Sequence, residues 1–488
     1  MFSYFFLSLS RKYPLILTKK YLSNSLFFGF LAAVNFFKNL VRNSIRCRPN
    51  RKTKHMKTSK IISLSAAVLL PLSFLACKKD NMVPADDIAE ESTITVQNVL
   101  QSKPLVESGT FQGTGTPLIL PGQSVTIQFS AAKGEALTFA TMYGASNDLF
   151  FAPDNPGFPV YDTQGKPIEG DVSEKVKLWD NGTRINQKPG TLVTHPGIQD
   201  NKPITEVIGA DAQGNPYLEA SKLIKASLKY DGNSRFTLTL QNTSGGTANE
   251  TPLSPGVWAV SYIAGGNLLS PAPLFTKDAP TANGLSSIAE TGNNEPLYTY
   301  LSNNTGIFTP LSPVLVVVYN GIDNPLYKLG ENDRNQGLKE LAQRGDASLL
   351  ATFLKGKNGI KAVYVLAAAN STVLLPKIAE QAGGVVLQKI STKKGDRLAI
   401  ATMYGFSNDW FFATGVEGID PLTKGDLSAS IGLYDNGTAI DQFPGAGITQ
   451  FNLAGTPLAE SKPISAVPNP NPFTTLPAIK DFVRVTIH

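Results

Sequence analysis

The chain repeats a long segment of itself, and this duplication constrains the fold more than any other feature. FSAAKGEALTFATMYGASNDLFFA, which begins at Phe129, returns as ISTKKGDRLAIATMYGFSNDWFFA from Ile390. Further along, LWDNGTRINQKPG ending at Gly190 matches LYDNGTAIDQFPG ending at Gly445. Chance does not produce matches of this length. The 488 residues also exceed what one hydrophobic core usually supports, so two homologous domains are expected.

Shorter echoes set the expected domain boundaries. The segment ITVQN at 94–98 parallels LTLQN at 238–242, and LIKASL at 223–228 loosely parallels FVRVTI at 482–487. If each ITVQN-like segment opens a domain, domain 1 covers residues 92–235 and domain 2 covers 236–488.

Domain 2 is then expected to hold an insert that is itself doubled. TPLSPGVWAV from Thr251 returns as TPLSPVLVVV from Thr309, and GLSSIAETG from Gly284 returns as GLKELAQRG from Gly337. Leu and Ala in the second pair have helical spacing, which predicts short amphipathic helices. The two copies of the insert are placed at 251–308 and 309–375.

Elsewhere apolar residues alternate with polar ones. Val125, Ile127 and Phe129 alternate with Thr126 and Gln128, which is typical of strands with one buried face. Forty-two Gly and 33 Pro punctuate these runs. The predicted fold class is all-β, with two tandem antiparallel β-sandwich domains.

The N-terminal region reads as a processing signal. From Met56, MKTSKIISLSAAVLLPLSFLACKKD has two lysines, an apolar run and a small residue before Cys77, the layout of a secretory signal. It resembles the lipobox of bacterial lipoproteins, although Phe74 and Leu75 depart from the usual residues. We expect a signal peptide at 56–76, lipidation of Cys77 and an acidic tether at 77–91. The alternative is a simple secreted protein with an ordinary cysteine.

Residues 1–55 lie upstream of this complete signal. We interpret them as an extension from a start codon chosen in error. The alternative is a transmembrane anchor at Leu22–Phe37, which is apolar enough to span a membrane.

Charge and cysteine content limit the partners of the remaining chain. Residues 1–76 hold 13 of the 44 basic residues and no acidic one, so the body has 31 basic against 38 acidic residues, a formal charge of −7. This argues against nucleic acid as a partner. Beyond Cys77 there is no cysteine, so no disulfide can form within the body. Lys78, Lys79 and Asp80 resemble the charged tags that follow the acylated cysteine in surface lipoproteins of Bacteroidota-type bacteria. We therefore expect an outer-membrane lipoprotein of the cell envelope, periplasmic or surface-exposed, bound to the membrane through acylated Cys77.

The two most faithfully repeated motifs resemble the spondin N-terminal domain, which has S-x-D-W-F and later a D-x-G-T turn. Here these are Ser407–Phe411 and Asp435–Thr438 in one copy, with 146–150 and 180–183 in the other. Ser254-Pro255 and the A-E-x-G at 289–292 also match the family pattern. The resemblance spans nearly all of 92–488. It implies an antiparallel β-sandwich similar to calcium- and lipid-binding sandwich domains, in a family whose animal members work in matrix adhesion.

The resemblance also implies Ca²⁺ held by loop carboxylates, and the matching residues are Asp148, Asp180, Asp409 and Asp435. Ca²⁺ prefers such hard oxygen ligands. The family's next acidic residue is replaced by Arg184 in one copy, where it would put a positive charge beside the ion, and by Ala439 in the other. Asn186 and Asp441 are candidates to compensate.

The same residues have a purely structural interpretation. Asp-Asn-Gly favours a tight hairpin turn, because Asn and Gly tolerate positive φ, and Asp148 or Asp409 would then only cap a loop. The sequence alone leaves the turn and the metal site open.

No common catalytic motif occurs: the chain has no G-x-S-x-G, no H-E-x-x-H and no phosphate-binding glycine loop. Only three histidines, His55, His195 and His488, are present. The leading hypothesis is a non-catalytic, envelope-anchored protein for ligand binding or adhesion to an unknown extracellular or periplasmic ligand. The alternatives are a carbohydrate-active enzyme with a carboxylate pair in the domain 2 insert and a structural spacer of a surface complex.

Overall fold

The structure is a computed structural model that describes residues 89–369, 371–448, 453 and 455–488. The described residues belong to one compact unit. The expected extension at 1–55, the signal at 56–76, Cys77 and nearly all of the tether lie outside them. Within the described part of the chain, no helix has the length and apolar character needed to cross a membrane.

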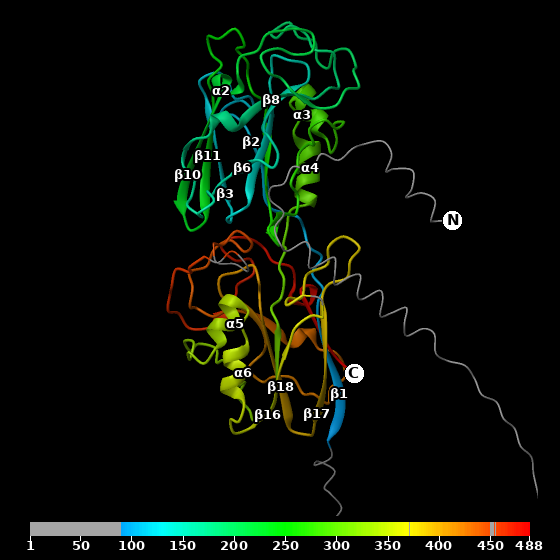
Figure 1. Cartoon of the computed structure of the whole chain (residues 1–488), viewed down its shortest axis with the longest axis vertical. Coiled ribbons are helices and arrows are strands. Elements are labelled where there is room, and N and C mark those ends of the chain that lie inside the picture. Colours follow the sequence, from blue (N-terminus) through cyan, green and yellow to red (C-terminus); the bar gives the residue numbers. More distant parts are fainter. Residues whose placement is uncertain (1–88, 370, 449–452, 454) are drawn as a thin grey trace, which may run out of the picture. The chain divides into compact units, whose positions relative to one another are not determined.

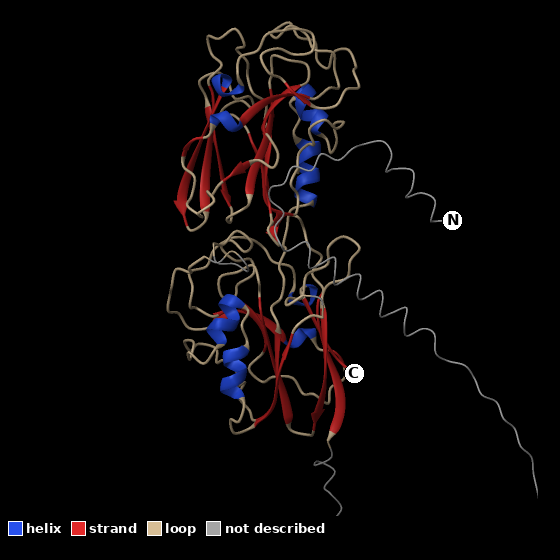
Figure 2. Cartoon of the chain, in the orientation of Figure 1, coloured by secondary structure: helices blue, strands red, loops and turns tan. Residues whose placement is uncertain are grey.

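The fold is all-β, with antiparallel sheets and a few short helices, as the alternating pattern predicts (Figures 1 and 2). One pair of sheets, called the first sandwich, is built from residues 105–261. Its smaller sheet has the order β3-β11-β10-β7, and its larger sheet has the order β2-β12-β4-β5-β8-β9. The strands are β2 (Leu105–Phe111), β3 (Ser124–Ser130), β4 (Ala136–Met142), β5 (Leu149–Pro153), β6 (Phe158–Pro159, paired with β4), β7 (Gly170–Asp171), β8 (Val176–Asp180), β9 (Thr205–Glu206), β10 (Ile224–Gly232), β11 (Arg235–Asn242) and β12 (Gly256–Ser261).

The second sandwich repeats this arrangement. Its smaller sheet has the order β17-β1-β23-β20 and its larger sheet the order β16-β15-β18-β19-β21-β22. The strands are β1 (Glu90–Asn98), β15 (Val314–Asn320), β16 (Ile360–Leu366), β17 (Val385–Thr392), β18 (Asp396–Met403), β19 (Trp410–Thr414), β20 (Gly425–Asp426), β21 (Ile431–Asp435), β22 (Ser465–Ala466) and β23 (Val483–Ile487).

The larger sheet of each sandwich is covered on both faces. On one face it shares a core with the smaller sheet, and on the other it packs against two helices. For this reason β4 and β18 are buried almost throughout, whereas β3 alternates between buried and exposed residues as predicted. The helices are α3 (Leu285–Thr291) and α4 (Glu295–Asn303) in the first sandwich, and α5 (Leu338–Arg344) and α6 (Ser348–Leu354) in the second.

The predicted short helices are confirmed, and their ends explain the repeated glycines. Gly292 and Gly345 follow α3 and α5 with a φ of 70° in both cases, the left-handed conformation that glycine supplies at a helix C-terminus. The remaining short elements are α2 (Ala220–Leu223), the 3₁₀ turns η2 (Ser173–Lys175), η3 (Ser428–Ser430) and η4 (Ile479–Asp481), and the hairpin β13 (Ile263–Ala264) and β14 (Asn267–Leu268).

The strand pairing contradicts the domain boundary expected at residue 236. In β1, Val96 pairs with Val386 of β17 and with Val485 of β23, so the ITVQN strand belongs to the second sandwich (Figure 1). The LTLQN strand, β11, instead pairs with β3 and β10 of the first sandwich. The prediction failed because it assumed that each such strand opens its own domain.

The prediction that domain 2 contains a doubled insert is also wrong. The TPLSP segment at 251–255 leads into β12 of the first sandwich, and the one at 309–313 leads into β15 of the second. Each sandwich therefore holds one copy of this segment and of the helix pair that follows it.

The first sandwich is inserted into the second, between β1 and β15. Its two ends lie side by side. The amide of Lys103 donates a hydrogen bond to the carbonyl of Ile307 at 3.1 Å, and the amide of Leu105 donates one to the carbonyl of Asn304 at 3.1 Å. Relative to the second sandwich, the order of equivalent strands in the first is circularly permuted: β11 occurs late in one, and its counterpart β1 occurs first in the other.

Candidate functional site

The two repeated motifs lie at the same end of their sandwich. The S-N-D segment leads directly into β19, and the D-N-G-T turn follows β21, whose antiparallel pairing aligns Trp410 with Asp435. The same pairing aligns Leu149 with Asp180 in the first sandwich. The start of a strand lies beside the end of its antiparallel neighbour, at the same end of the sheet. The aspartates of both motifs therefore come together.

In the second sandwich three carboxylates converge. Asp409, Asp435 and Asp441 each place one oxygen within 4.8 Å of the others, and no other group of three or more potential metal-ligating side chains occurs among the described residues. Asp409 and Asp435 are two of the predicted ligands. Asp441 is the residue that the sequence offered as a candidate to compensate for the missing acidic ligand, and the structure brings it to the other two aspartates.

The two carboxylate oxygens of Asp409 differ: one accepts three hydrogen bonds and the other accepts none among the described residues. Its Oδ2 accepts hydrogen bonds from the amide of Thr438 at 2.7 Å, the Thr438 hydroxyl at 2.9 Å and the amide of Ala439 at 2.9 Å. The residue is fully buried, and its Oδ1 has no hydrogen-bond partner within the described part of the chain. A buried carboxylate oxygen without a donor is costly, and either a cation or a proton shared with Asp435 would satisfy it.

The other two aspartates are partly engaged. Oδ1 of Asp435 accepts the amide of Gly437 at 2.8 Å, and Gly437 has a φ of 67°. The tight turn expected at D-N-G-T is confirmed, but it is not a hairpin turn, because Asp435 pairs with Ser465 of β22 rather than with a strand directly after the turn. Oδ1 of Asp441 accepts the indole Nε1 of Trp410 at 2.6 Å. The turn and a metal site are therefore compatible, because the turn uses only part of each carboxylate.

Burial raises the pKa of these groups. The pKa of Asp409 rises to about 7, first because the carboxylate is removed from water and then because Asp435 is close. Burial followed by the charge of Asp435 also raises the pKa of Asp441 to about 7, and burial raises the pKa of Asp435. A cation among the three would offset this penalty on the charged forms.

The first sandwich carries a related but less acidic site. Oδ2 of Asp148 accepts the amides of Thr183 at 2.9 Å and Arg184 at 2.8 Å, and its Oδ1 has no partner among the described residues. Oδ1 of Asp180 accepts the amide of Gly182 at 2.7 Å. At the place of Asp441 stands Asn186, whose amide donates to Oδ2 of Asp180 at 2.5 Å. The four predicted aspartates thus occupy equivalent positions, but among the residues that the structure describes a third carboxylate joins the pair only in the second sandwich.

Arg184 does not put its charge on the carboxylates of the first site, as the sequence suggested it would. Its guanidinium Nη2 lies 2.7 Å from Oε2 of Glu290 on α3. In the second sandwich the equivalent contact is neutral, since the amide of Gln343 on α5 donates to the Thr438 hydroxyl at 2.9 Å. Both pairs connect the helix that covers the sheet to the D-N-G-T turn.

Compared with models of known protein families and with curated proteins, the chain matches none of them. The likeness to spondin domains consequently rests on the repeated sequence motifs alone.

Proposed function

We propose that this chain is a non-catalytic lipoprotein of the cell envelope, with two spondin-like sandwiches that bind an extracellular or periplasmic ligand, and that it holds Ca²⁺ in the second sandwich. One observation carries the metal proposal. Three carboxylates converge within 4.8 Å, and one oxygen of the fully buried Asp409 has no donor among the described residues.

The donor set favours Ca²⁺ over transition metals. All three groups are carboxylates, two from loops and Asp435 from the end of β21, and the cluster contains neither histidine nor cysteine. Hard oxygen ligands suit Ca²⁺ and Mg²⁺, whereas zinc prefers nitrogen and sulfur. Loop carboxylates also tolerate the irregular coordination of Ca²⁺ better than the strict octahedron of Mg²⁺.

A binding or adhesion role is supported by the loops of the first sandwich. Residues 191–200, which follow its D-N-G-T turn, are mostly exposed, and loops held by a rigid scaffold are the usual binding surfaces of sandwich domains. The ion bound in the second sandwich would fix the loops that carry its ligands. The lipid anchor rests on the Cys77 segment of the sequence, which agrees with an envelope location.

Calorimetry with CaCl₂ tests the metal proposal. We expect binding heat and a rise in melting temperature, since a ligand at 100 times its Kd stabilises the folded state by about 2.7 kcal/mol. Asp441→Asn should remove most of this effect while keeping an oxygen for the Trp410 indole. The matched control is Asp426→Asn, an exposed carboxylate of the same sandwich whose Oδ1 bonds Ser428. Neither heat nor a melting shift at millimolar calcium would reject the proposal.

Mass spectrometry of the protein expressed in a bacterial host tests the anchor. We expect a mature N-terminus at Cys77 carrying acyl chains, and release of the Cys77→Ser variant from the membrane fraction. An unmodified thiol, or cleavage elsewhere, would contradict the anchor without touching the calcium proposal.

A further inference from the structure

The loop that carries Asp409 also contacts the first sandwich. Phe406 precedes Asp409 by three residues, and its ring lies 6.0 Å from that of Tyr262, which follows β12 of the first sandwich. The Phe406 ring also lies 5.3 Å from that of Phe308, which in turn lies 5.9 Å from Tyr262. All three side chains are buried. An aromatic contact between the sandwiches is thus built three residues from a proposed ligand.

The loop that carries Asp441 makes a second contact. The backbone carbonyl of Asp441 accepts the side-chain amide of Asn233, in the turn between β10 and β11, at 3.0 Å. Four residues further on, Gly445 lies against Tyr262 so closely that a Cβ at this position would come within 2.1 Å of the ring. The same loop therefore supplies a proposed ligand and the surface on which Tyr262 rests.

Hydrogen bonds join these two loops to each other. The side chain of Asn408 donates to the carbonyl of Ile440 at 2.6 Å, and the amide of Gly445 donates to the carbonyl of Phe406 at 2.8 Å. A change in the position of either loop is therefore transmitted to the junction with the first sandwich.

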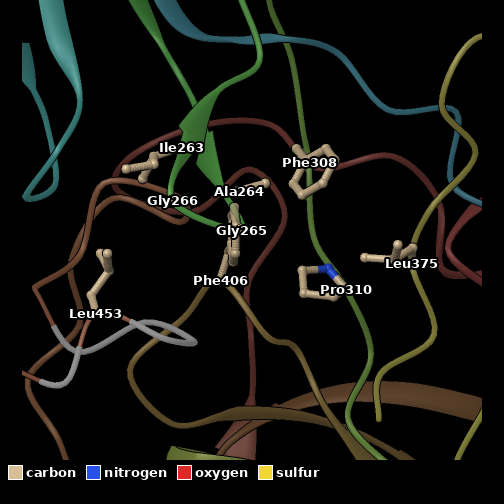
Figure 3. Close-up of a pocket in the computed structure, with 9 residues that line it drawn as sticks. All are labelled: Ile263, Ala264, Gly265, Gly266, Phe308, Pro310, Leu375, Phe406 and Leu453. Atoms are coloured by element: carbon tan, nitrogen blue, oxygen red, sulfur yellow. The ribbon is translucent and has the colours of Figure 1, made fainter. Parts of the chain in front are cut away.

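The junction also contains free volume. An apolar pocket of ≈ 100 Å³, partly open to the surface, lies between the β13–β14 hairpin of the first sandwich and Phe308, Pro310 and Phe406 (Figure 3). A close-packed interface would hold one geometry by itself, but an interface with a cavity forgoes part of that packing energy. The rigidity of the junction then depends more on the two loops of the second sandwich that carry Asp409 and Asp441.

The corresponding loops of the first sandwich have neither the aromatic side chain nor the third carboxylate. Ala145 stands where the second sandwich has Phe406, and Asn186 stands where it has Asp441. The amide of Gly190 still donates to the carbonyl of Ala145 at 3.0 Å, so the loop framework is the same. The third carboxylate and the aromatic contact occur together, and they occur in the copy that faces another domain.

From these contacts we propose that the cation site of the second sandwich is a junction clamp: a divalent cation held by Asp409, Asp435 and Asp441 fixes the two loops and thereby the orientation of the two sandwiches. Without the ion, three neighbouring carboxylates repel one another and the loops gain freedom. With the ion, Phe406 and the Asp441 carbonyl are held against Tyr262 and Asn233. This inference rests on the proposed cation binding and adds its structural consequence.

Distance measurements between spin labels on the two sandwiches test the clamp. Residues 77–488 with Cys77→Ser contain no other cysteine, so labels can be placed at Glu295→Cys on α4 and Lys355→Cys after α6, both exposed. We expect saturating CaCl₂ to narrow the distribution of label distances. Calcium binding by calorimetry with an unchanged distribution overturns the clamp and leaves the calcium site standing. Absence of binding rejects both.

Two variants separate the ion from the contact. Asp441→Asn should weaken calcium binding roughly tenfold or more, so that little of the narrowing remains at calcium concentrations near the wild-type Kd. Phe406→Ala should keep calcium binding within a few-fold but lose the narrowing, since it removes only the aromatic contact. The control Asp426→Asn should behave as wild type in both assays. If Phe406→Ala narrows on calcium like the wild type, the coupling through this loop is refuted.

Discussion

Replacing Asn98 tests whether the N-terminal strand belongs to the second sandwich. Asn98 ends β1 and is fully buried. Its Nδ2 donates to the carbonyl of Thr309 at 3.0 Å and to that of Leu374 at 2.9 Å, and its Oδ1 accepts the amide of Leu100 at 3.2 Å. Both acceptor carbonyls, those of Thr309 and Leu374, lie more than 200 residues after Asn98 in the chain and belong to the second sandwich.

The cost of Asn98→Ala follows from these bonds. Three hydrogen bonds contribute roughly 1 kcal/mol each in net terms, and two buried carbonyls are left without this donor. Thr309 and Leu374 are both fully buried, so water cannot easily replace the amide. We expect a loss of about 3 kcal/mol, which is a large share of the stability of a domain.

Hydrogen exchange followed by mass spectrometry locates that loss. In Asn98→Ala, peptides of β17, β18 and β23 should exchange faster, whereas those of β3, β4 and β10 should stay close to wild type. Asn242→Ala is the matched variant, because the Nδ2 of Asn242 donates to Ile119 at 2.9 Å and Thr251 at 2.7 Å in the first sandwich. It should produce the reverse pattern. Faster exchange of β3 and β10 in Asn98→Ala would refute the strand assignment.

Three further predictions probe other parts of the molecule. Burial raises the pKa of Glu107 to about 7, so the folded state favours its protonated form. The free energy of unfolding is therefore highest below about pH 4.5, as far as this group is concerned, and falls as the pH rises through 7. Glu107→Gln should thus stabilise by up to about 3 kcal/mol at pH 8 and little at pH 4.5 in urea unfolding, and equal effects at both pH values would contradict this. Asn186→Asp, placed in an Asp441→Asn background, should raise calcium affinity of the first sandwich in calorimetry; unchanged heats would argue against a charge-limited site. Replacing residues 104–305 by a short Gly-Ser linker should leave a second sandwich that unfolds cooperatively by circular dichroism, because the ends of the insertion meet at Lys103 and Ile307; a non-cooperative chain would speak against the insertion.

Local patterns predicted local structure well. The alternation at Val125, Ile127 and Phe129 is that of β3, in which these three side chains are buried. The Leu-Ala spacing after Gly284 and Gly337 predicted α3 and α5. Such patterns succeed because the side chains of one element either face a core or face water, and the period of the element decides which.

The strands of the larger sheets were harder to recognise. In β4 the sequence ALTFATM places Thr138 and Thr141 among apolar residues, and both are buried. The Thr141 hydroxyl donates to the carbonyl of Ser254 at 2.7 Å, which makes its burial tolerable. A strand covered on both faces has no polar side, so period-two analysis does not identify it.

The candidate site was only partly predictable. The repeated motifs indicated Asp409 and Asp435, because both are fixed by short-range turn chemistry and by neighbouring strands. Asp441 was named only as a candidate to compensate for a missing acidic residue, because its place depends on a loop that returns to the site and the matching residue of the other copy is Asn186. A conservative-looking Asn-to-Asp difference between repeats marked the position at which the two sites diverge.

The permuted domain order could have been deduced from one pairing rule. In each sandwich the Asn that ends the x-T-x-Q-N strand donates to the threonine carbonyl of a T-P-L-S-P segment: Asn242 to Thr251, and Asn98 to Thr309. Asn242 precedes Thr251 by only nine residues, so this loop closes at a low entropic cost. The Asn at the end of β11 therefore bonds to the nearer of the two T-P-L-S-P segments. Thr309 has no such strand shortly before it, because the intervening chain forms α3 and α4. ITVQN at 94–98 is the one remaining candidate, and it can reach Thr309 only if everything between them folds as an insertion with adjoining ends.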